Sequence, residues 1–286
     1  DGDIDFDAVA AGSSITFDGT GTITTTGTGD ITIDAGDTAA VDIDTNNSGV
    51  SLNSDDEVLI GSTRRSATVD ISGAVTADEL IDIDADANIT IDQNAVLLTD
   101  EPTAVSGDID IFSDVGTVAL LNTARIQAEP ADTDDTADVI VEGDAITLNS
   151  DNGLEVEAGG DINLTADAGS VLIQNDMTSG QDMRLTSIGS SGTAGDADVT
   201  IDGANGDGAS ADLTAIGTAD TGFIDIRAID DVIIFGDLAD SVEISIGDLT
   251  KGLGLYIYAD ADGTLDDNID AGIGLDSTGG NVIIGT

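Results

Sequence analysis

The sequence predicts an all-β fold, namely a parallel β-helix solenoid with about three short strands per rung that occupies residues 1–286 as one unit. Short alternating phrases such as "GDIDI" at Gly107–Ile111 and "GDINL" at Gly160–Leu164 recur along the whole chain. Alternation of apolar and polar residues indicates strands with one buried face. Most gaps between such phrases are too short to hold a helix, and the phrases return with a three-strand period, which is the pattern of a solenoid.

Each predicted strand begins at the first apolar residue of an alternating phrase, and a glycine or an acid before that residue indicates a turn. In chain order these residues are Ile4, Ile15, Ile23, Ile31, Val41, Val50, Val58, Val69, Ile81, Ile89, Val96, Ile109, Val118, Ile126, Val139, Ile146, Leu154, Ile162, Val171, Met183, Val199, Leu213, Ile224, Val232, Ile244, Leu255, Ile273 and Val282.

Taken in threes, these strands give a period that is regular to about residue 171. Ile4, Ile31 and Val58 follow one another at intervals of 27 residues, the next interval from Val58 to Ile89 is 31, and Val171 to Leu213 is 42. The lengthening predicts longer inserted loops from about 174 to 222. Tandem β-sandwich domains are the alternative fold, because sandwich strands recur at similar spacing. The low aromatic content of 2% favours the solenoid, since sandwich cores usually contain aromatic anchors.

The composition limits the classes of partner. The chain has 58 acidic and 6 basic residues, a formal charge of −52, and no histidine or cysteine. Nucleic acid and anionic lipid surfaces need cationic proteins, so the sequence predicts no nucleic-acid partner. The longest apolar runs are shorter than the roughly 18 residues of a membrane span, so we also expect no direct membrane insertion. Hydrophobic residues at 40% are enough for a core.

Two groups of acids are candidate Ca²⁺ ligands. If Ile81 and Ile83 point inward, Asp82, Asp84 and Asp86 share the outer face of one strand, and Ca²⁺ prefers several carboxylate and carbonyl oxygens. The alternative is a solvated face that keeps the protein soluble.

The second group lies in "YADADGTLDDNID" and resembles part of a D-x-D-x-D-G calcium loop. Tyr258 and Ile269 occupy two of the main ligand positions in that alignment, so an acidic turn is the alternative. The candidate ligands of this group are Asp260, Asp262, Asp266 and Asp267.

The sequence predicts no catalytic residues. A histidine-dependent triad is impossible, and the single lysine, Lys251, has no basic companion. The pair Arg64–Arg65 predicts either an ordinary loop or a docking point for the acidic surface of a neighbouring copy.

The phrases "GDITIDAGD", "ITLNSDNGLEVEAGGDINLTADAGSVLI" and "GGNVIIGT" resemble the repeats of filamentous-haemagglutinin-type adhesins and related large bacterial surface proteins. This resemblance implies a right-handed β-helix in an exported adhesive or structural fibre, located at the cell surface or outside the cell. Alternatives are a calcium-dependent surface-layer protein and a polysaccharide-binding or polysaccharide-cleaving β-helix protein, with cell-surface polysaccharide as partner.

Strand phrases at both chain ends predict a homopolymer formed by end-to-end stacking, because uncapped rungs expose unpaired strand edges.

Overall fold

The structure is a computed structural model. It describes residues 2–8, 10, 13–17, 19–36, 40–43, 50–62, 65–92, 94–100, 107–129, 137–150, 156–189, 197–203, 211–216, 222–229, 231–237, 242–246, 255–258, 273–278 and 282–284.

Three ten-stranded parallel sheets form the fold, and consecutive strands along the chain belong to different sheets. The first sheet, called sheet A, contains β1 (Ile4–Ala8), β4 (Ile31–Ala35), β7 (Glu57–Ile60), β10 (Leu80–Ala85), β13 (Asp108–Ser113), β16 (Val139–Gly143), β19 (Ile162–Ala166), β22 (Met183–Ser187), β25 (Ile224–Ala228) and β28 (Leu255–Tyr258). Sheet B contains β2 (Ile15–Thr16), β5 (Ala40–Ile43), β8 (Thr68–Ile71), β11 (Ile89–Ile91), β14 (Thr117–Asn122), β17 (Ala145–Ser150), β20 (Val171–Ile173), β23 (Val199–Asp202), β26 (Val232–Asp237) and β29 (Ile273–Thr278). Sheet C contains β3 (Gly21–Thr24), β6 (Val50–Asn53), β9 (Ala74–Ala77), β12 (Val96–Thr99), β15 (Arg125–Ala128), β18 (Val156–Ala158), β21 (Met177–Ser179), β24 (Leu213–Ala215), β27 (Val242–Ile246) and β30 (Val282–Ile284).

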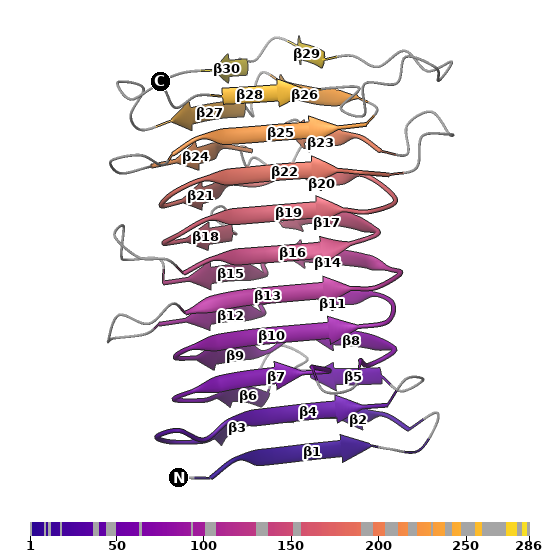
Figure 1. The fold of residues 1–286 in the computed structure, drawn as a ribbon, viewed down its shortest axis with the longest axis vertical. Helices are drawn as coiled ribbons and strands as arrows, with labels where there is room; N and C mark the ends of the chain where they lie inside the picture. Colours follow the sequence, from indigo (N-terminus) through magenta and orange to yellow (C-terminus); the bar gives the residue numbers. More distant parts are fainter. Residues whose placement is uncertain are drawn as a thin grey trace.

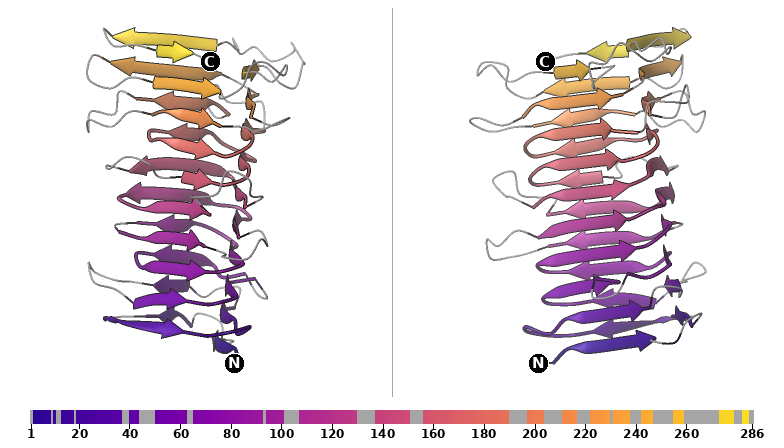
Figure 2. Two further views of the ribbon diagram at one scale, coloured as in Figure 1. Left: turned by 90° about the vertical axis from the view of Figure 1, so that its left-hand side faces the viewer. Right: turned by 45° about the vertical axis from the view of Figure 1, so that its right-hand side comes forward.

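Each rung therefore holds one strand of each sheet, and the rungs stack into a rod with the first rung at one end and the tenth at the other (Figures 1 and 2). In Figure 1 the front strands of sheet A run from left to right, and the chain returns behind them as it climbs, so the coil is right-handed. Right-handed connection is the usual hand for parallel strands, because it matches the twist of the strand. The predicted parallel β-helix with three strands per rung is confirmed, and the parallel in-register stacking is incompatible with tandem sandwiches.

The core consists of aliphatic side chains stacked in columns. In the first rungs Ile4 pairs in register with Ile31, which pairs with Val58, so like side chains lie above one another. The apolar residues of the alternating phrases point inward, and eight of them are at most 1% exposed: Ile31, Ile33, Ile81, Ile83, Ile109, Ile111, Ile162 and Leu164. Because the side chains of a strand point alternately to its two faces, the residues between them lie on the outside.

Glycine at a corner allows neighbouring rungs to approach closely. A Cβ atom added at Gly29 would lie 2.8 Å from the carbonyl oxygen of Gly2 in the preceding rung. A Cβ added at Gly180 would overlap the carbonyl oxygen of Gly159 in the same way. Glycine at these two corners thus permits the close spacing of the rungs, since a side chain there would push the two backbones apart.

Two strands were missed by the sequence analysis, and their omission shifted the predicted rung spacing. β9 has the sequence "AVTA" and β21 has "MTS", so each offers a single large apolar side chain to the core. The interval from Val58 to Ile89 therefore joins different sheets, because the in-register neighbour of Val58 is Ile81. Likewise, the neighbour of Val171 is Val199 rather than Leu213.

The stacking order of the sheets continues beyond residue 171 to β30. The predicted insertions between 174 and 222 fall partly on residues 190–196, 204–210 and 217–221, which lie outside the described residues, as does Leu154, the predicted start of the strand observed as β18. Within the described part of the chain, no helix has the length and apolar character needed to cross a membrane.

Candidate functional site: the outer face of sheet A

Four aspartates at the starts of strands β13, β16, β19 and β22 of sheet A each link one rung to the next. Asp108 Oδ1 accepts the backbone N–H of Asp138 at 2.9 Å, Asp138 Oδ1 accepts that of Asp161 at 2.7 Å, and Asp161 Oδ1 accepts that of Asp182 at 2.9 Å. Asp182 Oδ1 continues the series to the N–H of Gly222 at 2.8 Å. We call this series the aspartate ladder. It extends the backbone hydrogen bonding of the sheet by one charge-assisted bond per rung at the corner.

The same arrangement occurs at the corners of the other two sheets. In sheet B the side chain of Asn88 accepts the N–H of Thr117 at 3.0 Å, and in sheet C Asp176 accepts the N–H of Asp212 at 2.9 Å. An asparagine at one of these positions shows that the shared requirement is an acceptor oxygen rather than a charge. The first acid of "GDIDI" and "GDINL" is therefore structural.

The second acid of "GDIDI" has a different environment. Asp110 lies beside Asp82 in register on the outer face, while Asp84, Phe112 and Glu142 form the neighbouring column. These side chains line a shallow groove of about 260 Å³. Asp110 Oδ1 is buried and accepts no hydrogen bond. The groove is thus a partly desolvated acidic surface.

Desolvation and repulsion from neighbouring acids raise the pKa of Asp82 and Asp110 in the groove and of Asp138 in the ladder. Burial, followed by the charges of Asp84, Asp110 and Glu57, raises the pKa of Asp82 to about 6. Burial likewise raises the pKa of Asp110, with further contributions from Asp108, Asp84 and Glu142. The pKa of Asp138 in the ladder rises to about 6, mainly through burial, although the hydrogen bond from the Asp161 backbone opposes the rise. Low dielectric and like charges both disfavour the ionised form.

The calcium candidates are only partly brought together. Asp82 and Asp84 share the outer face of β10 as predicted, but β10 ends at Ala85 and Asp86 lies in the following turn. Its backbone N–H donates to the carbonyl of Ser66 at 2.7 Å. The described residues contain no group of three or more acids arranged to hold a metal ion. The second candidate group, Asp260, Asp262, Asp266 and Asp267, lies outside the described residues, and calcium binding stays a prediction.

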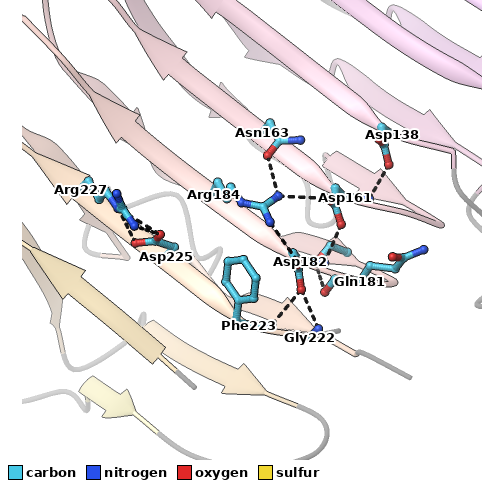
Figure 3. A network of polar contacts seen from close by, with 11 residues as sticks. Asp138, Asp161, Asn163, Gln181, Asp182, Arg184, Gly222, Phe223, Asp225 and Arg227 are labelled. Carbon is cyan, nitrogen blue, oxygen red and sulfur yellow. Dashed lines mark hydrogen bonds and ion pairs between the residues drawn. The ribbon is translucent and has the colours of Figure 1, made fainter. Parts of the chain in front are cut away.

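Towards the C-terminal end of sheet A the outer face carries arginine as well as acid. Arg184 on β22 donates to Asp161 at 2.9 Å, to Asp182 at 3.0 Å and to Asn163 at 3.2 Å, and so joins two ladder aspartates (Figure 3). Arg227 on β25 pairs with Asp225 at 2.6 Å in the same sheet (Figure 3). Neither arginine was predicted from the sequence as a functional residue. The available signal was the rarity of basic residues, which makes each one a candidate for a specific pairing.

The predicted basic patch contains one described residue. Arg65 pairs with Asp114 at 3.1 Å, and its guanidinium carbon lies 4.5 Å from the centre of the Phe112 ring. Arg65 therefore contacts its own chain at the edge of the acidic groove. Arg64 and Lys251 lie outside the described residues.

These features define the class of protein: a right-handed parallel β-helix whose rungs are joined by a side-chain ladder and whose outer face is acidic. Comparison with protein families, with curated proteins and with solved structures finds no match to this chain. The resemblance to filamentous-haemagglutinin-type repeats remains a prediction from the sequence.

Proposed function

We propose that the chain is a non-catalytic structural segment of an adhesive fibre at the cell surface or in an extracellular matrix, and that rungs of adjoining units stack end to end. The observation that carries this proposal is the one-directional stacking of the described rungs, and the first rung shows what one face of a rung consists of. Its inward-facing side chains Phe6, Ile15, Phe17 and Ile23 are only partly buried, whereas Ile31 and Ile33 one rung further on are fully buried.

The first rung has the properties of an interface between rungs. Phe6 and Phe17 meet edge to face with their ring centres 4.9 Å apart, which forms an apolar layer across the end of the rod. Among the described strands, β1, β2 and β3 each pair with one neighbour, so the other edge of each has no strand partner within the described part of the chain. A further rung, from a second copy or from an adjoining segment of one polypeptide, would bury the layer and pair these edges.

The ladder gives such stacking a direction. Each described ladder carboxylate accepts an N–H from the following rung, so the two faces of a rung are chemically different. A contact between unlike faces does not close on itself and therefore produces a filament. Repulsion between acidic outer faces disfavours side-by-side contact and supports growth along the axis.

The test is the assembly state of the 286-residue chain. We expect thin fibres in electron micrographs, with an axial repeat of roughly 48 Å for ten rungs at the usual strand spacing. Phe6→Glu places a charge in the apolar layer and should shift the sedimentation profile towards monomer. Asp5→Asn is the matched control, because Asp5 lies on the exposed face of the same strand and should leave assembly unchanged. A monodisperse monomer at all concentrations for the unmodified chain would contradict the proposal, and a two-dimensional lattice would favour a surface layer instead.

A further inference from the structure

Aromatic side chains gather on the outer face of sheet A near its C-terminal end. Tyr256 and Tyr258 on β28 are 41% and 46% exposed, and Phe223 immediately precedes β25. The chain has only two tyrosines, five phenylalanines and no tryptophan, so three of its seven aromatic residues lie here. We call these three residues, together with Arg184 and Arg227, the aromatic strip. Exposed apolar surface rimmed by polar groups is typical of binding sites.

The rings of the aromatic strip are held by contacts within the sheet. Phe223 and Tyr256 meet edge to face, with ring centres 6.3 Å apart. The guanidinium carbon of Arg227 lies 5.3 Å from the centre of the Tyr258 ring, and that of Arg184 lies 4.6 Å from the Phe223 ring. In-register pairing places Arg227 beside Tyr258. A surface held in this way loses little conformational freedom when a ligand binds.

The charge of the aromatic strip selects against anionic ligands. Arg184 is paired with Asp161 and Asp182, and Arg227 is paired with Asp225, so both guanidinium groups already have carboxylate partners. The chain as a whole carries −52. A polyanion would be repelled by this field, whereas an uncharged polymer would not.

We propose that the aromatic strip binds a neutral polysaccharide that lies along β28 and across β25. The apolar C–H face of a sugar ring can stack on an exposed aromatic ring, and its hydroxyl groups can bond to polar groups around it. The arginine–aspartate pairs provide both donors and acceptors for those hydroxyls. Tyr256 and Tyr258 are two residues apart on one strand, which separates them by roughly 6.6 Å, so an extended polymer can contact both. This inference rests on the proposed adhesive role and names its ligand class.

The two tyrosines provide a built-in probe. Because the chain has no tryptophan, tyrosine emission arises from the aromatic strip alone. We expect titration of the 286-residue chain with xylan, hydroxyethylcellulose and dextran to give a saturable emission change with at least one of them. The anionic polymer polygalacturonate should give none.

Variants are compared by affinity electrophoresis in the responding polysaccharide. Tyr256→Ala and Tyr258→Ala should each weaken binding about tenfold. Arg227→Gln keeps both tyrosines and should weaken binding without disturbing the core, since Arg227 is exposed. Phe235→Ala is the control, because Phe235 is an exposed aromatic residue on β26 in another sheet and should bind as the unmodified chain does.

Three results would overturn the inference: no response to any of the neutral polysaccharides, equal binding by the tyrosine variants and the Phe235 control, or stronger binding to polygalacturonate. All titrations are made at one fixed protein concentration, because β28 is the last strand of sheet A and end-to-end stacking would itself change tyrosine emission. Fibre assembly depends on the first rung and is measured separately with Phe6→Glu, so failure of either proposal is recognised independently of the other.

Discussion

The phrase "GDIDI" contains two aspartates that should respond in opposite ways to removal. Asp108 accepts the Asp138 N–H at 2.9 Å, whereas Asp110 has a buried oxygen with no hydrogen-bond partner. A hydrogen bond to a charged acceptor stabilises by about 1.5–3 kcal/mol. Asp108→Ala also removes a like charge that acts on Asp138, which offsets part of this loss. We therefore expect Asp108→Ala to lower the free energy of unfolding by about 1–2 kcal/mol. Asp110→Ala, the matched control, should leave it unchanged or raise it.

Urea unfolding gives the global effect, and hydrogen exchange at the Asp138 amide gives the local one. Solenoids can open rung by rung, so the amide is the more direct measurement. Asp108→Asn retains an acceptor oxygen and should restore most of the protection, as Asn88 serves the same role in sheet B. Equal stability of Asp108→Ala and Asp110→Ala, with unchanged exchange at Asp138, would refute the distinction between ladder and groove aspartates.

Three further predictions concern pH, the core and ions. The pKa values of Asp82 and Asp138 are raised to about 6 from 3.8, so the folded chain binds these protons more tightly than the unfolded chain, and the melting temperature should rise as pH falls from 7.5 to 5. For Asp82 this rise in pKa corresponds to roughly 3 kcal/mol. Contact with solvent reduces the figure, and Asp82→Asn should stabilise by about 1 kcal/mol at pH 7.5; a lower melting temperature for this variant would contradict the assignment. Ile162→Asp buries an unpaired charge and should cost 3 kcal/mol or more, whereas Asn163→Asp on the outer face should cost under about 1 kcal/mol; equal costs would refute the inside–outside pattern. Sodium chloride should raise the melting temperature by screening the acids, and calcium at equal ionic strength should raise it further if a specific site exists; equal effects of the two salts would argue against such a site.

The sequence by itself determined which side chains are buried. Alternation with a period of two permits only one orientation of a strand such as Ile162–Ala166 relative to the core, because a one-residue shift would expose its isoleucine and leucine. The solenoid fold was predicted from the repeated spacing of the strands. β9 and β21 were missed because each offers little apolar surface to the core. In β21 the inward position at Ser179 is polar and yet fully buried, so composition gave no strand signal.

Only the tertiary structure decided what the acids do. Asp108 and Asp110 are the same residue type two positions apart, and the alternating pattern does not show that Asp108 accepts an N–H from the next rung whereas Asp110 faces an acidic groove. The ladder joins residues 21 to 40 positions apart, and this separation depends on how each rung closes. The aromatic strip has the same origin, because Phe223 and Tyr256 meet only after one full turn of the coil. Stacking in register brings residues that are one rung apart in the sequence into lateral contact. Which residues meet depends on the length of each rung, and the alternating pattern alone does not specify that length.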